Sequence, residues 1–114
     1  MPDCLFCRIA AKEIPSQIVF EDEQVVAFKD INPQGPVHIL VIPKRHIANV
    51  ATAAAEDEAL LGHILCVGAQ VAAEAGVAES GFRLVFNRGA HAGEAVPHLH
   101  LHVIGGRPLA WPPG

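Results

Sequence analysis

Three histidines alternate with apolar residues in the segment VPHLHLHVI, which covers residues 96–104. Side chains alternate along a strand, so we expect His98, His100 and His102 to line one open face while the apolar residues share the other. At ~3.3 Å per residue the outer two histidines lie roughly 13 Å apart, too far for one zinc ion whose bonds to nitrogen are ~2.0–2.1 Å long. The three imidazoles must therefore have different roles. A central imidazole between two others suits nucleophilic attack on phosphorus or an acyl carbon, because its neighbours can fix its tautomer and donate to the developing charge.

The second group with chemical potential is the pair Cys4 and Cys7, a CxxC near the N-terminus of a chain with three cysteines. An odd count argues against a disulfide framework, and in a reducing compartment a CxxC indicates metal binding or redox chemistry. No thioredoxin-like βαβ pattern surrounds the pair, which favours the metal. The third cysteine, Cys66, lies in an apolar helical run and is predicted to be a core residue.

The composition limits the classes of function. The chain has 114 residues, 51% of them hydrophobic and 18% charged, which predicts one soluble domain over residues 1–114. A net charge of -4 gives no electrostatic case for nucleic-acid binding. No apolar run approaches the ~20 residues of a membrane span, and no signal peptide is visible. We therefore expect a cytoplasmic protein with neither a nucleic-acid nor a membrane partner.

Short strands around one long helix are predicted to position these residues. The long helix follows from a stripe of apolar residues at helical spacing over 56–75, and Gly76 is expected to end it. Asp3 is predicted to cap a short helix that runs to about Lys12. His38 is the one polar residue in an apolar strand. The expected strands cover 18–21, 25–29, 37–42, 82–87 and 98–104. Hairpins that flank one helix indicate an α+β fold with an antiparallel sheet.

The chain resembles the histidine triad (HIT) superfamily of nucleotide hydrolases and transferases, and within it the Hint branch of purine nucleoside phosphoramidases. The resemblance is carried by the HxHxH motif and by three further segments, CLFCRIAAKEIPS, VVAFKDINPQGPVHILVIPKRHI and GGRPLAWPPG. It implies a HIT-like fold with a five-stranded antiparallel sheet, one long and one short helix, and a homodimer whose two sheets join into one.

The resemblance also implies a reaction, the cleavage of the P–N bond in adenosine or guanosine 5'-phosphoramidates and aminoacyl adenylates. His100 matches the family nucleophile, which takes the nucleotidyl group before water releases it as a nucleoside monophosphate. His102 matches the histidine that hydrogen-bonds the phosphate, and His38 matches a fourth histidine that orients the nucleophile.

Further positions match the nucleotide pocket of the family. They comprise the apolar purine walls, the acceptor for the ribose hydroxyls and the side that faces the phosphate: Leu5, Phe6, Ile9, Phe28, Asp30, Ile31, Leu40, Asn87, Gly93, Ala95 and Val96. Ala95 is a departure, since the Hint branch usually has a serine there whose hydroxyl faces the phosphate and the leaving group. Pro97 also replaces a residue with a backbone N–H.

Some bacterial members of the family hold a structural zinc ion with a CxxC, a histidine after the third strand and the first triad histidine. The matching residues here are Cys4, Cys7, His46 and His98. Two other readings stay open: a homodimeric nucleotide-binding interaction module with weak or no turnover, and a dinucleoside polyphosphate hydrolase or nucleotidyltransferase of the same superfamily. The C-terminal WPPG favours the Hint branch. His63 and His91 are given no role.

Overall fold

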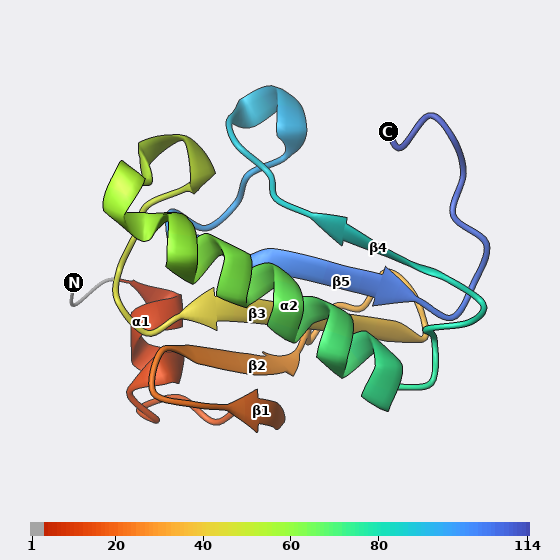
Figure 1. The fold of residues 1–114 in the computed structure, drawn as a ribbon, viewed down its shortest axis with the longest axis horizontal. Coiled ribbons are helices and arrows are strands. Elements are labelled where there is room, and N and C mark those ends of the chain that lie inside the picture. Colours follow the sequence, from red (N-terminus) through yellow and green to blue (C-terminus); the bar gives the residue numbers. More distant parts are fainter. Residues whose placement is uncertain (1–3) are drawn as a thin grey trace.

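A single antiparallel sheet forms the centre of the computed structural model, which describes residues 4–114 (Figure 1). The helices are α1 (Leu5–Ala10) and α2 (Glu58–Glu74), and the strands are β1 (Ile18–Glu21), β2 (Val25–Lys29), β3 (Val37–Pro43), β4 (Phe82–Val85) and β5 (Leu101–Gly105). Three short 3-10 turns lie at Val50–Thr52, Ala55–Asp57 and Ala90–Ala92. The predicted α+β fold, with five antiparallel strands, one long helix and one short helix, is confirmed.

The strands lie in the order β1-β2-β3-β5-β4, so that β3 and β5 are next to each other near the middle. In this pair, His38 is opposite Ile104 and Leu40 is opposite His102. The register therefore brings two histidines that are 64 residues apart to neighbouring positions on adjacent strands.

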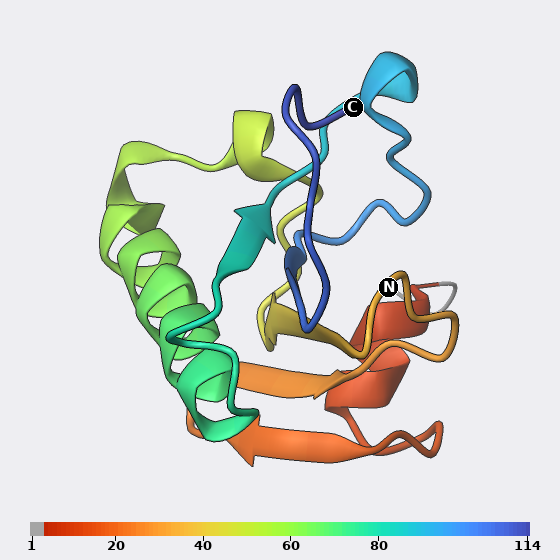
Figure 2. The same ribbon diagram turned by 90° about the vertical axis from the view of Figure 1, so that its right-hand side faces the viewer.

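The two helices pack on opposite faces of the sheet (Figure 2). Each face has its own apolar cluster because alternate residues of a strand point to opposite sides. Helix α2 packs on one set, which includes Val25, Ala27, Ile39, Val41, Leu99, Leu101 and Val103. Helix α1 packs on the other set, which includes Phe6, Ile9, Val26, Phe28, Leu40 and Ile42. The histidine motif runs between the two layers.

Local hydrogen bonds set the helix ends. Helix α1 is capped by Cys4, whose Sγ accepts the N–H of Cys7 at 3.2 Å; the predicted cap Asp3 lies outside the described residues. Helix α2 starts two residues later than expected, because Asp57 is buried in a 3-10 turn where it accepts the N–H of Ala54. Gly76 follows the helix with a φ of +84°, which confirms the expected stop.

Two expectations about the elements are wrong. Strand β5 begins at Leu101 and not at His98, because the N–H of Leu99 donates to the carbonyl of Ile47, outside the ladder with β3. Cys66 is exposed, since the buried stripe of α2 runs through Ile64, Val67 and Gly68 instead. Within residues 4–114, neither helix is long and apolar enough to cross a membrane.

The contact between α2 and the sheet generates a stability prediction at two glycines of the same helix. A Cβ on Gly68 would lie 2.7 Å from Cδ2 of the buried Leu101, whereas a Cβ on Gly62 would meet no atom within 4 Å. Overpacking a core costs about 1–3 kcal/mol, and alanine gains about 1 kcal/mol over glycine in a helix. Gly68→Ala should therefore lower the free energy of unfolding and Gly62→Ala should raise it. Urea denaturation measures both, and equal effects at the two sites would contradict this packing.

Candidate functional site

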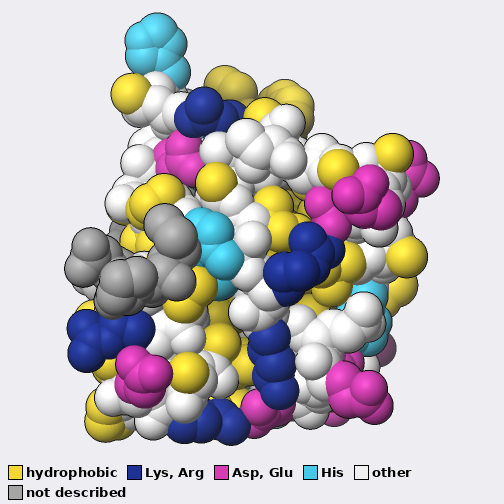
Figure 3. Space-filling model, turned by 90° about the vertical axis from the view of Figure 1, so that its left-hand side faces the viewer, with side chains coloured by type: hydrophobic (Ala, Val, Ile, Leu, Met, Phe, Trp, Pro, Cys, Tyr) yellow, Lys and Arg dark blue, Asp and Glu magenta, His cyan; other side chains and the backbone are white. Residues whose placement is uncertain are grey.

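The three histidines of the motif lie on the face of the sheet that α1 covers. They are more buried than expected: His98 is 0% and His100 is 8% exposed. The expectation of an open face is wrong because Phe6 of α1 packs its ring edge-on against both, with ring centroids 5.0 Å from His100 and 6.0 Å from His98. Figure 3 views the molecule from the side on which the N-terminal helix lies, and shows histidine side chains at the surface near the centre of this view.

His100 has one ring nitrogen fixed by the backbone. Its Nδ1 lies 2.7 Å from the carbonyl oxygen of His98. A carbonyl oxygen only accepts, so Nδ1 carries the proton and the lone pair of the neutral ring is on Nε2. The ring is held between Phe6 and His102, whose ring centroids are both 5.0 Å away. This tautomer suits a nucleophile.

His102 belongs to a separate cluster with His38 and Asp30. Its Nδ1 is 2.9 Å from Nε2 of His38, which in turn is 3.4 Å from a carboxylate oxygen of Asp30. Burial lowers the pKa of His38. Burial, together with the neighbouring rings of His100 and His38, lowers the pKa of His102 to about 4. Both rings are therefore neutral near neutral pH and can serve as hydrogen-bond donors.

The N–H of Gln34 donates to Nδ1 of His38 at 2.9 Å. Sequence reasoning did not find this contact. The donor is a backbone group that every residue type except proline provides, so its identity leaves no signal in the sequence.

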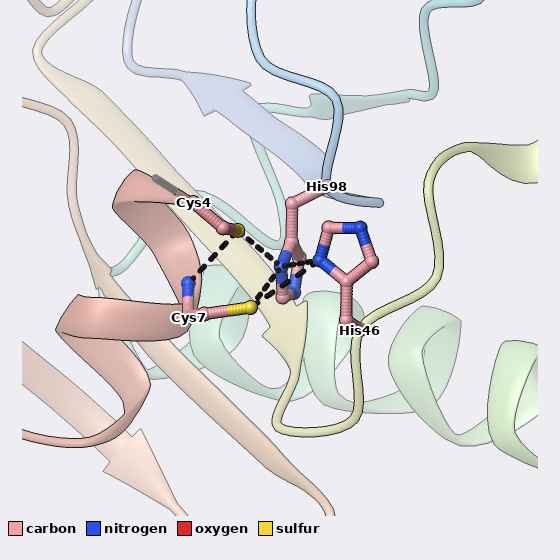
Figure 4. Close-up of side chains that lie close together, drawn as sticks. All are labelled: Cys4, Cys7, His46 and His98. Atoms are coloured by element: carbon pink, nitrogen blue, oxygen red, sulfur yellow. Dashed lines mark hydrogen bonds between the residues drawn. The ribbon is translucent and has the colours of Figure 1, made fainter. Parts of the chain in front are cut away.

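The side chain of the first triad histidine, His98, lies in a cluster with Cys4, Cys7 and His46 (Figure 4). Nδ1 of His98 lies 3.1 Å from Sγ of Cys4, 3.4 Å from Sγ of Cys7 and 3.2 Å from Nδ1 of His46. Sγ of Cys7 lies 3.3 Å from Nδ1 of His46. These separations are close to the edges of a tetrahedron around zinc, which are roughly 3.3–3.8 Å for bonds of ~2.0–2.3 Å.

Cation binding to this cluster needs a free imidazole lone pair and the loss of the thiol protons. Nε2 of His98 donates to the carbonyl of Pro43 at 2.9 Å, so Nδ1 presents a lone pair to the two sulfurs. Burial and the neighbouring Cys4 raise the pKa of the Cys7 thiol to about 11 when no cation is bound. Two sulfurs and two imidazole nitrogens that face one point are a donor set that suits zinc.

The positions matched to the purine walls are only partly brought together. Phe6, Ile9, Phe28 and Leu40 are buried in one apolar cluster, and Val96 packs against it. Leu5 is 45% exposed and Ile31 is 99% exposed, so the structure places these two outside the cluster.

On the side matched to the phosphate, Asn87 is half-buried, while Gly93 and Ala95 are exposed. Gly93 has a φ of +77°, a backbone conformation that glycine adopts without strain. Glu94 lies in the same loop and was not found by sequence reasoning. Its carboxylate accepts the N–H of Gly89 at 2.9 Å, which is the main cause of its lowered pKa, and a hydrogen bond from Arg88 at 3.0 Å lowers the pKa further.

A cavity of about 490 Å³ lies on the other face of the sheet, under the last turn of α2. Its lining includes the apolar side chains Val19, Val37, Ile39 and Val71 and the charged Lys29 and Glu74. None of the residues matched to the purine walls lines it, but Asp30 and His38 do. The cavity therefore adjoins the Asp30–His38 end of the site and is separate from the apolar cluster beside α1.

The comparisons with known proteins agree with this fold. The family model of the HIT domain matches residues 11–109, and the chain belongs to the HIT family. An uncharacterized HIT-like protein of Synechocystis sp. is 53% identical over 112 residues, which are 98% of this chain and 97% of the relative. The structure of a HIT family hydrolase from Legionella pneumophila is 49% identical with a TM-score of 0.96, covering 98% of this chain and 100% of its own. A histidine triad protein from Clostridium difficile has a TM-score of 0.93 and 42% identity, covering 96% of each chain.

The lowered pKa of His102 predicts how stability depends on pH. Between about 6.5 and about 4 the unfolded chain protonates this imidazole and the folded chain does not, so the free energy of unfolding falls as pH decreases through this window. His102→Gln should remove part of this slope and leave the parts due to His38 and His98, whose pKa values are also lowered. Denaturation at several pH values measures the slopes, and the same slope in variant and wild type would contradict the burial of a neutral His102.

Proposed function

We propose that this chain hydrolyses purine nucleoside 5'-phosphoramidates, with adenosine or guanosine as the nucleoside, and that the reaction passes through a nucleotidyl group on His100. The observation that carries the proposal is the hydrogen bond from Nδ1 of His100 to the carbonyl of His98, which leaves the Nε2 lone pair free. Membership of the HIT family and the hydrolases among its structural relatives support the reaction class.

In the first step, Nε2 of His100 attacks phosphorus. The P–Nε2 bond forms, the P–N bond to the amine breaks, and the electron pair of that bond leaves with the amine, which takes up a proton from solvent. Water then attacks phosphorus and gives up a proton to solvent, the P–Nε2 bond breaks and its electron pair returns to the imidazole, so that a nucleoside monophosphate is released. His102 supplies an N–H to the phosphate oxygens, and Asp30 accepts from the ribose hydroxyls.

Because residue 95 is alanine, this reaction scheme lacks one hydroxyl group that the Hint branch usually has. An alanine has no hydroxyl, so it cannot give a proton to the departing amine as a serine at this position would. This observation favours a second candidate function, a nucleotide-binding interaction module in which turnover is weak. Turnover of an adenosine phosphoramidate by the wild type and by His100→Ala separates the two functions. If the protein binds the nucleotide but its release of amine does not depend on His100, the interaction module is the better description.

A panel of P–N and P–O–P substrates tests the third reading, a dinucleoside polyphosphate hydrolase.

Trapping the intermediate tests the nucleophile directly. Quenched wild-type protein should show a nucleotidyl adduct on the peptide that contains His100, and His100→Gly should show none. His91→Gly, which changes an exposed histidine in the same segment, is the control and should retain the adduct. Mass spectrometry identifies the labelled residue, and a label on His98 or His102 would refute the assignment.

We also propose that Cys4, Cys7, His46 and His98 hold one structural zinc ion. The donor set, the separations and the orientation of His98 by Pro43 support it. All four protein ligands fill a tetrahedron, so the ion would stabilise the fold and activate no water. The reducing cytoplasm, which the sequence predicts, would keep both thiols available for the metal.

Metal analysis of protein purified without a histidine tag should give about one zinc per chain. Cys4→Ser should lose the zinc and lower the melting temperature, because structural zinc contributes to the free energy of folding. Cys66→Ser changes an exposed cysteine outside the cluster and should do neither. Zinc-free protein of unchanged stability, never exposed to a chelator, would exclude the site.

A homodimer is the third part of the proposal. Strand β4 is at one edge of the sheet, and its four residues are all half-buried. Unpaired edges are prone to pair with another chain, and pairing of two β4 edges would join two sheets into one. Light scattering should give about twice the chain mass of 12.1 kDa at micromolar concentration. A mass equal to that of one chain would contradict the dimer.

A further inference from the structure

The loop between β2 and β3 fixes the proton of a buried histidine. The N–H of Gln34 donates to Nδ1 of His38 at 2.9 Å. A backbone N–H cannot accept, so Nδ1 is unprotonated and the one proton of the neutral ring is on Nε2. The side chain of His38 is 3% exposed, so water does not compete for this nitrogen.

The proton on Nε2 of His38 has two acceptors within reach. Nδ1 of His102 is at 2.9 Å and an oxygen of Asp30 is at 3.4 Å. Hydrogen bonds with a nitrogen donor have lengths of about 2.7–3.2 Å, so the proton goes to His102. Nδ1 of His102 is therefore an acceptor, and the neutral ring carries its own proton on Nε2.

A residue far along the chain holds the loop in this position. Nε of Arg107 donates to the carbonyl of Gln34 at 2.9 Å. The two segments approach closely, since a Cβ on Gly106 would lie 2.8 Å from Cβ of Pro36. The φ of Gly106 is +89°, so glycine meets both the space and the backbone requirement there.

We propose that Arg107 is a positioning residue that holds the Gln34 backbone against His38 and thereby makes the Nε2–H of His102 a hydrogen-bond donor. In this chain of hydrogen bonds, the N–H of Gln34 donates to Nδ1 of His38, and Nε2–H of His38 donates to Nδ1 of His102. The last step, donation from His102 to the reacting phosphate, rests on the proposed function, whereas the two tautomers are a property of the free protein.

Asp30 makes this arrangement sensitive to the ribose. In the free protein its carboxylate lies 3.4 Å from Nε2 of His38 and attracts the proton that His38 donates to His102. Ribose hydroxyls that donate to Asp30 weaken this attraction and so strengthen the bond from His38 to His102. Occupation of the ribose site then strengthens the tautomer that the phosphate needs.

Nitrogen-15 NMR of the histidine rings tests the inference without substrate. The free wild type should show His38 and His102 each with its proton on Nε2, and Arg107→Ala should show a mixture of tautomers at both rings. Arg83→Ala removes a similar bond, from an exposed guanidinium to the carbonyl of Ala110, and should leave both rings unchanged. A proton on Nδ1 of His38 in the wild type, or unchanged rings in Arg107→Ala, would overturn the proposal.

Two further variants separate the N–H from the side chain. Gln34→Pro removes the donor and should change the tautomer of His38, whereas Gln34→Ala keeps the N–H and should not. Equal spectra from the two would also overturn the proposal, and if Gln34→Pro does not fold, the Arg107 comparison decides.

Kinetics then test the link to the reaction. In Arg107→Ala, kcat should fall about tenfold or more, with a much smaller change in KM, since loss of a positioned donor acts on the transition state. Arg107→Lys, which can still donate to the Gln34 carbonyl, should restore part of kcat. The expected tautomers in a protein that does not cleave P–N bonds would refute the proposed function and leave the tautomer assignment standing. An unchanged kcat in an active Arg107→Ala would refute the catalytic role of the relay.

Discussion

Three polar atoms of His98 make the contacts around which the site is built. Its Nε2 donates to the carbonyl of Pro43, its Nδ1 faces two thiols and a second imidazole, and its backbone carbonyl accepts the proton of His100. The ring is completely buried, so no water can replace any of its partners. The orientation of His100 is thus tied to the same residue that closes the Cys–His cluster. A substitution in the Cys–His cluster is therefore expected to alter the orientation of His100, and a substitution at His100 to alter the cluster.

Strand β3 carries or precedes several of the residues that make these contacts. It carries His38 near its start, it ends at Pro43, and His46 follows three residues later. Its register with β5 sets Leu40 opposite His102, which brings the ring of His102 within hydrogen-bond distance of His38. One buried strand therefore positions both the cluster of sulfur and nitrogen atoms and the pair of neutral imidazoles.

The alternation of the histidine motif was enough to predict which residues face α2, since Leu99, Leu101 and Val103 all lie in that core cluster. It was not enough to predict the burial of the imidazoles. That burial depends on Phe6, some 90 residues earlier, and no local period carries the information. The exposure of Cys66 was missed for a related reason, because a helix rich in alanine and glycine has a weak apolar stripe and its rotation is set by the sheet beneath it.

The site residues also divide into those that the sequence identifies and those that only the folded structure reveals. Side chains with distinctive chemistry, such as Cys4 and His46, were found from their types and spacing and from the family resemblance. The N–H of Gln34 and the carbonyls of Pro43 and His98 were not, because backbone groups are common to nearly all residues and become specific only in the folded chain. The exposed position of Ile31 likewise depends on the path of a loop that its composition does not determine.

Helix α1 has six residues, and helices shorter than about 12–15 residues are marginal in water by themselves. Its structure therefore depends on the contacts that Phe6 and Ile9 make with the sheet and on the two cysteines that face His46 and His98. Four of its residues, Phe6, Cys7, Ile9 and Ala10, form one side of the apolar cluster next to His100. We therefore expect this part of the molecule to open as a unit more often than the central strands do. Access of a ligand to the side of the triad next to α1 would then depend on the frequency of that local opening.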